Sequence, residues 1–159
     1  MTIRQYKNDD LQAIMNIGNQ AYQYIYANLA RIYGKELFEF LFPNEKTKTM
    51  KGLQIKEFCE KHPQWVYVCE KKGRIVGFIT FLLKKNDRIG ILGDNAVDPN
   101  CGLKGIGQQM YKAVLNYFKQ QGMLYAEVRT DMDNIPATKA YTCTGFNIKR
   151  EQIIYYKKL

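Results

Sequence analysis

The sequence predicts an α+β fold, with a mixed, mostly antiparallel central sheet and helices on both faces of that sheet. Three β-prone runs follow one another between residues 65 and 97, and only short polar turns separate them, which is typical of an antiparallel meander. An amphipathic helix and a further strand come next, so a β–α–β crossover adjoins the meander. Helical periodicity fills most of the chain before residue 63 and supplies the remaining helices.

The composition indicates one globular domain over residues 1–159. Hydrophobic residues make up 46% of the chain and charged residues 25%, a balance that excludes intrinsic disorder. No apolar run approaches the roughly 20 residues of a membrane span. The first residues also lack the apolar segment of a signal peptide. We therefore expect a cytoplasmic domain that does not enter a membrane.

The N-terminal part of the chain is expected to contain one edge strand and several helices. Residues 2–6 alternate weakly between polar and apolar side chains, as an edge strand does. The Asn-Asp-Asp sequence at residues 8–10 offers cap groups for a helix predicted over residues 11–21. Aromatic side chains are frequent between residues 22 and 42, and a further helical stretch covers residues 50–58.

The predicted meander has three strands with two polar turns between them. Residues 65–69 form the first strand, and Lys71–Gly73 has the composition of a hairpin turn. A longer run rich in Ile, Val, Phe and Thr covers residues 74–83. Polar residues 84–88 form the second turn, and residues 89–97 form the third strand.

The last third of the chain is predicted to be α, β, α, β. A helix begins near Lys104 and ends before Gly122, which suits the residue after a helix C-terminus. Its apolar face is formed by Ile106, Met110, Ala113, Val114, Tyr117 and Phe118. Residues 124–128 form a strand and residues 136–141 a short helix, and residues 146–157 contain one or two final strands. The helix and the two strands beside it form a β–α–β unit at the centre of the expected sheet.

Charge is the first feature that bears on function. The chain has 24 Lys plus Arg against 15 Asp plus Glu, a net charge of +9. Such a balance attracts nucleic acid, an anionic membrane surface or a phosphate-rich cofactor, although dispersed lysines equally fit a solvated surface. The basic residues are dispersed and no aromatic RNA-binding motif accompanies them, so the sequence does not favour nucleic acid as a partner.

The metal-binding residue types are too few and too scattered for a zinc site. The single histidine, His62, precedes Pro63 and is expected in an exposed loop. Four cysteines are widely spaced and none forms a CxxC pair: Cys59, Cys69, Cys101 and Cys143. We expect reduced thiols and no metal.

The segment with the clearest chemistry is the glycine-containing loop at residues 98–107. It follows a strand and opens a helix, where unpaired backbone N–H groups and the helix dipole favour an anion. A tight turn with close helix–sheet packing is the alternative. The Lys and Ser or Thr of a Walker A loop do not follow Gly107, and Met110 stands where a dinucleotide fingerprint has a small residue.

Two short motifs stand in a fixed order around this loop. The strand ends in Val97-Asp98-Pro99, and Gly105-Ile106-Gly107 follows at the start of the helix. The later short helix carries the second motif, which consists of Asn134, Ala137, Tyr141 and Gly145-Phe146.

With these two motifs the chain resembles the GNAT superfamily of acetyl-CoA-dependent N-acetyltransferases, from about Trp65 to Leu159. The usual Gln or Arg of the superfamily's glycine motif falls on Gly102 here, and its frequent Gly falls on Leu103. That departure removes one side chain that would help to fix the loop. Lys104 is close enough in sequence to compensate electrostatically.

The resemblance implies a splayed pair of central strands that holds acyl-CoA. The main chain of Ala96 and Val97 is expected to pair with the amides of the pantetheine arm. The N–H groups of residues 103–108 are expected to hold the pyrophosphate. Asn134 is expected either to contact the cofactor or to cap its own helix. The implied cofactor-binding residues are Ala96, Val97, Gly102, Leu103, Lys104, Gly105, Ile106, Gly107, Gln108, Asn134, Ala137 and Ala140.

The resemblance also implies an acid, and the attacking ammonium must lose a proton, so a carboxylate or a chain of water molecules is expected as the base. Tyr141 is expected to protonate the departing thiolate, and the alternative is a core aromatic with no chemical role. Asp94 is the first candidate for the base that deprotonates the attacking amine, and Asp131 or Asp133 is the second. Each of these acids could instead serve only in a turn or at the surface.

The function implied by the resemblance is transfer of an acetyl group from acetyl-CoA to a primary amine on a small molecule or a peptide. Residues 22–42 and the final strands are expected to line the acceptor side, where aromatic rings could hold a cation. A CoA-binding regulatory module without turnover stays open, as does a basic acyltransferase that acts on a charged tRNA. The sequence also leaves a homodimer open.

Overall fold

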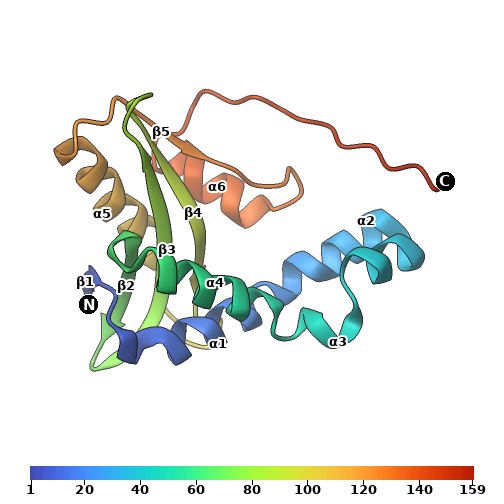
Figure 1. The fold of residues 1–159 in the computed structure, drawn as a ribbon. Coiled ribbons are helices and arrows are strands. Elements are labelled where there is room, and N and C mark those ends of the chain that lie inside the picture. The colour runs from blue at the N-terminus through green and yellow to red at the C-terminus, as the bar shows by residue number, and fades with distance from the viewer.

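The computed structural model describes residues 1–159, apart from the side chains of Asn44 and Glu45. Among the described residues, five strands form one sheet in the order β1-β2-β3-β4-β5 (Figure 1). The strands are β1 (Thr2–Gln5), β2 (Val66–Lys71), β3 (Arg74–Lys84), β4 (Ile89–Val97) and β5 (Tyr125–Val128). β1 to β4 are antiparallel neighbours and β5 runs parallel to β4, as the mixed-sheet prediction requires.

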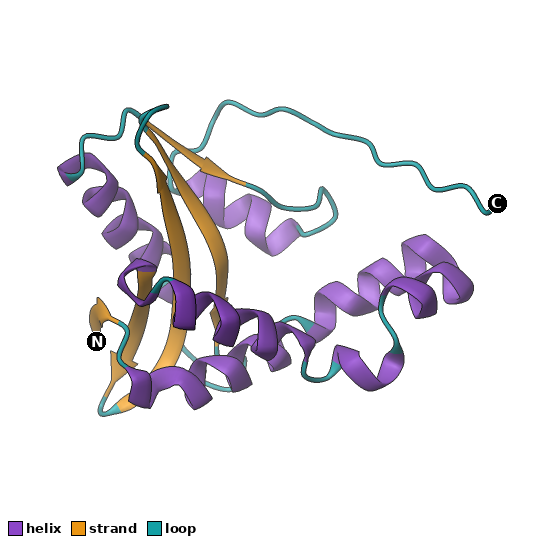
Figure 2. Ribbon diagram, viewed as in Figure 1, coloured by secondary structure: helices purple, strands orange, loops and turns teal.

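Helices cover both faces of this sheet, which confirms the predicted architecture (Figure 2). They are η1 (Asn8–Asp10), α1 (Leu11–Ala21), α2 (Gln23–Leu41), α3 (Asn44–Thr47), α4 (Met50–Lys61), η2 (Pro63–Trp65), α5 (Ile106–Gln120) and α6 (Ile135–Cys143). Within the described residues, no helix is long and apolar enough to cross a membrane.

One face of the sheet is covered by α1 and α4. Ile14 of α1 and Ile55 of α4 have no exposed surface and pack with Phe78 of β3. Burial of a side chain of this size contributes about 1.5–3 kcal/mol. The pair of helices is therefore fixed on the sheet, and the side chains that extend from them toward β4 are fixed as well.

The opposite face is covered by α5. Met110 and Val114 are fully buried there against Ile79 and Phe81 of β3, in one cluster with Phe118. The helical spacing of these positions produces one continuous apolar stripe, which explains why the helix lies flat on the sheet. Tyr141 of α6 joins the same cluster.

A bulge interrupts β4 midway along its length. Ile79 pairs with Asn95 and Phe81 with Leu92, so Thr80 alone faces both Gly93 and Asp94. The Thr80 hydroxyl donates to the Asp94 carbonyl over 3.2 Å. A Cβ on Gly93 would lie 2.5 Å from Thr80 Oγ1, so only glycine fits. Bulges of this kind bend the strand that carries them.

β4 also continues beyond the end of β5. The two strands pair only over Ile89–Leu92 with Tyr125–Val128, and the chain then leaves β5 toward α6 (Figure 1). No strand among the described residues pairs with this edge of Gly93–Val97. The β4–α5–β5 unit was expected at the centre of the sheet, which is wrong: β5 is the last strand in the sheet order, so the unit lies at one edge and leaves part of β4 open on that side.

The predicted final strands at residues 146–157 are wrong. The structure describes residues 146–159 throughout and shows no strand there; the chain runs out past α2, where Tyr156 meets Tyr33 with ring centroids 5.4 Å apart (Figure 1). A run of β-prone residues becomes a strand only when a ladder partner is beside it. Residues 146–157 lie away from the sheet and therefore have no strand to pair with.

The expected exposed position of His62 is also wrong. Its ring stacks on Trp65 with a centroid distance of 5.0 Å and lies 5.3 Å from the ring of Phe58, so the side chain is half-buried. The aromatic neighbours come from the end of α4 and from η2, and the His62-Pro63 dipeptide alone does not indicate them.

A polar cluster joins β1, β2 and the start of α1. The Arg4 guanidinium donates to both carboxylate oxygens of Asp10, at 2.7 and 2.9 Å, and to Glu70 at 2.8 Å. The Lys7 N–H also donates to Asp10 over 2.8 Å. Asp10 is only 6% exposed. The bonds from Arg4 and then Lys7 hold the pKa of the Asp10 carboxyl below its ordinary value.

Replacement of Asp10 is expected to change both stability and its pH dependence. A carboxylate with a lowered pKa stabilises the fold above its unfolded pKa of about 3.9, and this contribution is lost as the pH falls through the folded pKa. Asp10→Asn should lower the free energy of unfolding by about 2 kcal/mol at pH 7. Denaturant titrations from pH 7 to 2 should show a shallower acid loss in the variant, and an unchanged pH profile would contradict this role.

Candidate functional site

The N-terminus of α5 presents backbone N–H groups with no protein partner. The residue before the helix is Gly105, whose φ of 78° lies in the left-handed region that favours glycine. No side chain caps this end, and within the described chain no acceptor meets the N–H groups of Ile106, Gly107 and Gln108. Such an end combines free donors with the positive end of a helix dipole, as the sequence predicts for an anion cradle.

The loop before α5 is held in place by Asp98. This residue is 5% exposed, and its N–H donates to the Val76 carbonyl over 2.9 Å. One carboxylate oxygen accepts from the Asn100 N–H at 2.8 Å, and the other pairs with Arg74. The loop therefore starts from a fixed point on the sheet, although Gly102 and Lys104 further along it are exposed.

The open edge of β4 lies beside this helix end. Ala96 is buried and Val97 is half-buried, and both pair with β3 on the other side. Along an unpaired strand edge, backbone N–H and C=O groups are available to a ligand that carries amides. The structure therefore leaves an extended edge at Gly93–Val97, and the chain leads from the end of this edge into the anion cradle.

One face of β4 carries a cluster around Asp94. Tyr22, between α1 and α2, donates its hydroxyl proton to Asp94 Oδ1 over 2.9 Å. Lys51 of α4 places Nζ 3.2 Å from the same oxygen and 4.3 Å from the centre of the Tyr22 ring. Burial, and then the Asp94 charge, raise the pKa of Tyr22, so its phenol stays a donor. Only 12% of the Lys51 side chain is exposed, against 37% of Asp94.

The opposite face of β4 carries a second cluster around Asn95. Tyr111 of α5 donates to Asn95 Oδ1 over 2.7 Å, and Asn95 Nδ2 donates to the Tyr141 hydroxyl over 3.4 Å. The rings of Tyr111 and Tyr141 lie 5.2 Å apart. Burial and the neighbouring Tyr141 raise the pKa of Tyr111. Tyr141 is 7% exposed and held at its ring and its hydroxyl.

The clusters that contain Asp94 and Tyr141 therefore lie on opposite faces of β4. Successive side chains of a strand alternate between faces, so Asp94 extends toward α1 and α4 while Asn95 extends toward α5 and α6. Besides burial and the Asp94 charge, Tyr141 contributes to the raised pKa of Tyr22. The open edge of β4 is the place where both groups can act on one ligand, since no neighbouring strand separates the faces there.

The other predicted residues are the cofactor-binding residues of α6 and the two alternative bases. Asn134 caps α6, because its Oδ1 accepts from the Ala137 N–H over 3.4 Å. Ala137 and Ala140 are half-buried against the core on the α5 face. Of the alternative bases, Asp131 is exposed, while Asp133 has a buried Oδ2 with no hydrogen-bond partner.

Three residues of the site were not predicted as functional, namely Lys51, Asn95 and Tyr111, and Tyr22 was expected only as part of the acceptor segment. Asn95 interrupts an apolar strand, and such an interruption does not by itself identify a functional residue. Tyr22 belongs to the aromatic segment expected on the acceptor side. Lys51 and Tyr111 give no local signal, because a lysine on a helix and a tyrosine beside an apolar stripe are ordinary. Among the described residues, no group of three or more His, Cys, Asp or Glu side chains could hold a metal ion.

Comparison with known proteins gives one family and one fold. A family model described as "Acetyltransferase (GNAT) family" matches residues 29–146. The PaiA N-acetyltransferase of Thermoplasma acidophilum, solved in complex with coenzyme A, superposes with a TM-score of 0.72 at 19% identity and covers 95% of this chain and 92% of its own. The ribosomal-protein-S18-alanine N-acetyltransferase of Escherichia coli gives 0.66 at 18% identity, over 94% and 79%.

A curated relative matches a shorter stretch. Mycothiol acetyltransferase of Segniliparus rotundus is 26% identical over 95 residues, which are 55% of this chain and 35% of that protein. The chain therefore spans about a third of the length of this relative. Because the family model covers most of the sequence and the solved structures share its fold, the chain belongs to the GNAT acetyltransferase family.

Proposed function

We propose that this protein, as one domain, transfers an acetyl group from acetyl-CoA to a primary amine by direct attack. The observation that carries the proposal is the open edge of β4, which ends at the uncapped N-terminus of α5 and has Asp94 and Tyr141 on its two faces. Membership of the GNAT acetyltransferase family supports the same reaction class.

The residues present fit acetyl-CoA as the acetyl donor. Its pantetheine arm is extended and carries amides, which match the unpaired backbone of Gly93–Val97. Its pyrophosphate matches the N–H groups at the start of α5, and the open space around Gly105 lets a ligand approach the backbone. Acetyl-CoA supplies the activated acyl group as a thioester. The PaiA N-acetyltransferase was solved with coenzyme A on the same fold.

The two clusters supply complementary proton transfers. Asp94 can accept a proton from the incoming ammonium, directly or through water, and Lys51 and Tyr22 orient the carboxylate through Oδ1. The freed amine attacks the thioester carbon, so a C–N bond forms and the C–S bond breaks. The Tyr141 hydroxyl donates its proton to the departing sulfur, and Asn95 fixes the direction of that hydroxyl. A thiol with a pKa of about 8.5 and a phenol near 10 are close enough for this transfer. The extra proton on the new amide nitrogen passes to solvent, from which Tyr141 regains its proton after turnover.

The acceptor side is formed by the α1–α2 junction and α4, because Tyr22 and Lys51 lie on the Asp94 face. The aromatic segment in α2 continues from this junction and is interrupted at Gly34, where φ is 72°. Solved relatives on this fold include one named for an alanine of a ribosomal protein. For this chain we infer only the class of acceptor, a primary amine, and a cytoplasmic setting.

Coenzyme A should stabilise the fold. A ligand at 100 times its Kd raises the free energy of unfolding by about 2.7 kcal/mol, so the thermal midpoint should rise by several degrees. Differential scanning fluorimetry with millimolar CoA measures the shift, and titration calorimetry measures the Kd. No shift together with no heat of binding would remove the basis of the proposal.

A matched pair of variants tests the anion cradle. Gly105→Asp and Gly105→Asn add side chains of nearly equal shape, and both residue types tolerate a left-handed φ. Only Asp adds a negative charge where the pyrophosphate is proposed to bind. We expect the Asp variant to bind CoA at least about tenfold more weakly than the Asn variant, a difference of about 1.4 kcal/mol. Equal affinities of the two variants would show that no anion binds there.

Tyr141→Phe should reduce turnover without reducing CoA affinity. The substitution keeps the ring and removes the proton donor, and general acid catalysis contributes roughly 10²- to 10⁴-fold. We therefore expect kcat to fall by about that factor, with Kd for CoA and Tm nearly unchanged. Tyr67→Phe is the control, because that tyrosine packs against Phe81 and Tyr117 away from the site. Full kcat in a folded Tyr141→Phe protein would refute the acid role but not the fold.

Asp94→Asn should lower kcat/KM for the amine, because the variant has no carboxylate to accept the proton. CoA binding should change little. Asp131→Asn and Asp133→Asn are the matched comparisons, since these acids follow β5 instead. If the activity loss appears in one of them and not in Asp94→Asn, the base belongs to that residue.

A further inference from the structure

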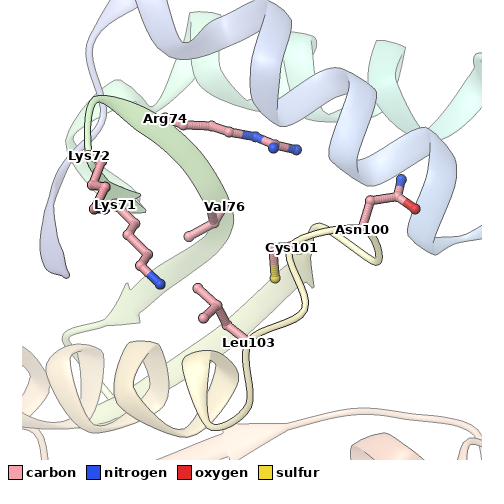
Figure 3. Close-up of a pocket in the computed structure, with 7 residues that line it drawn as sticks. All are labelled: Lys71, Lys72, Arg74, Val76, Asn100, Cys101 and Leu103. Carbon is pink, nitrogen blue, oxygen red and sulfur yellow. The ribbon is translucent and has the colours of Figure 1, made fainter.

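A basic cavity of about 300 Å³ lies beside the proposed pyrophosphate cradle and has no role in the chemistry above. It is formed between the β2–β3 turn and the loop that follows β4 (Figure 3). Figure 3 shows Lys71 from the turn and Cys101 and Leu103 from the loop directed into the same space. Its lining consists of Lys71, Lys72, Arg74, Val76, Asn100, Cys101 and Leu103.

The cavity has an excess of positive charge. Three of its lining residues are cations and none is an acid. Arg74 is already paired with the buried Asp98. In the described part of the chain, neither Lys71 nor Lys72 has an ion pair. Two lysines with no carboxylate partner, beside the apolar side chains of Val76 and Leu103, suit a ligand that carries both a phosphate and an apolar or aromatic group.

The turn that presents these lysines is conformationally costly at Lys72. Its φ is 51°, and Gly73 follows with a φ of 75°. Positive φ at both central residues is the requirement of a type I′ hairpin turn, in which Asn-Gly is favoured and lysine is not. Non-glycine residues in the left-handed region cost free energy and occur often at functional sites, so Lys72 supports a functional hypothesis. Here the unusual residue is one of the two lysines without an ion pair.

The cavity and the cradle share one loop, which is attached to the sheet at Asp98. Leu103 lines the cavity and also begins the run of backbone N–H groups assigned to the pyrophosphate. Asp98 fixes the loop to β3 through its N–H bond to Val76 and its pair with Arg74. The separation between the lysines and the start of α5 is therefore set by the sheet.

We propose that this cavity binds the 3′-phosphate of the adenosine end of coenzyme A through Lys71 and Lys72. The inference rests on the proposed function, because it concerns the same cosubstrate. Coenzyme A carries its 3′-phosphate one ribose away from its pyrophosphate. A second cationic site that adjoins the first cradle therefore fits this donor and not an acyl thioester that lacks the nucleotide. The flanking Val76 and Leu103 provide an apolar surface beside the ribose.

The test compares CoA with 3′-dephospho-CoA, which lacks only this phosphate, by titration calorimetry. Charge-assisted bonds of this kind correspond to about 10- to 100-fold in affinity, so the wild type should prefer CoA by that factor. In the Lys71→Gln/Lys72→Gln variant the preference should fall to about 3-fold or less. Affinity for 3′-dephospho-CoA should stay within about 3-fold of wild type, because the pyrophosphate cradle is intact.

Two further variants control for the loss of net charge and for the conformation of the turn. Lys84→Gln/Lys85→Gln removes the same charge at the β3–β4 turn, at the far end of β3, and should retain the preference for CoA. Lys72→Asn removes one of the two charges and supplies the residue that a type I′ turn favours, so its Tm should not fall while part of the preference is lost.

Each outcome separates the two proposals. A preference that is unchanged in the Lys71→Gln/Lys72→Gln variant, while CoA still binds, overturns the 3′-phosphate site and leaves the proposed function standing. An equal loss of preference in the Lys84→Gln/Lys85→Gln variant means that net charge alone is responsible, and it also overturns the site. If the folded wild type binds neither CoA nor 3′-dephospho-CoA, both proposals fail.

Discussion

The separation of β4 from β5 after Leu92 is the constraint on which the rest of the site depends. Up to that residue the two strands share a parallel ladder; beyond it, Gly93–Val97 keep one edge free. The bulge opposite Thr80 bends β4 where the ladder ends, and it requires glycine because any Cβ at residue 93 would collide with the Thr80 hydroxyl. An open strand edge inside a domain would normally invite unwanted pairing. Here α5 and α6 lie on one face of the sheet, and α1 and α4 lie on the other.

The open edge also explains why the two polar clusters can cooperate. Asp94 and Asn95 are consecutive, so their side chains extend to opposite faces, and in a fully paired sheet the clusters around them would be isolated from each other. On the Asp94 side, Tyr22 and Lys51 satisfy one carboxylate oxygen. On the Asn95 side, Tyr111 orients the amide and the amide orients Tyr141. Each candidate catalytic group is thus positioned by a neighbour from a different helix, and the proposed reaction takes place between the two faces.

In the proposed mode of CoA binding, backbone N–H groups make the main contacts with phosphate, and side-chain charges add to them. The uncapped start of α5 supplies donors that need no particular side chain, which is why glycine at residue 102 is compatible with a working cradle. Lys71 and Lys72 add charge from a different element, the β2–β3 turn. The buried Asp98, bound to Arg74 and to the backbone of Asn100, keeps the loop and that turn in a constant relation.

Local sequence was sufficient for most of the secondary structure. The strand at Ile89–Val97 has the predicted bounds, and α5 follows its predicted apolar stripe, because both patterns arise from side chains close together in the chain. Residues 146–157 have equally β-prone composition and form no strand, since strand formation needs a partner that composition does not reveal. The site divides in the same way. The uncapped start of α5 was predictable, because a strand, a glycine loop and a helix are consecutive. The contacts of Asp94 were not, because Tyr22 lies 72 residues away in sequence and Lys51 lies 43 away, and only the packing of α1 and α4 on the sheet brings these side chains to one oxygen.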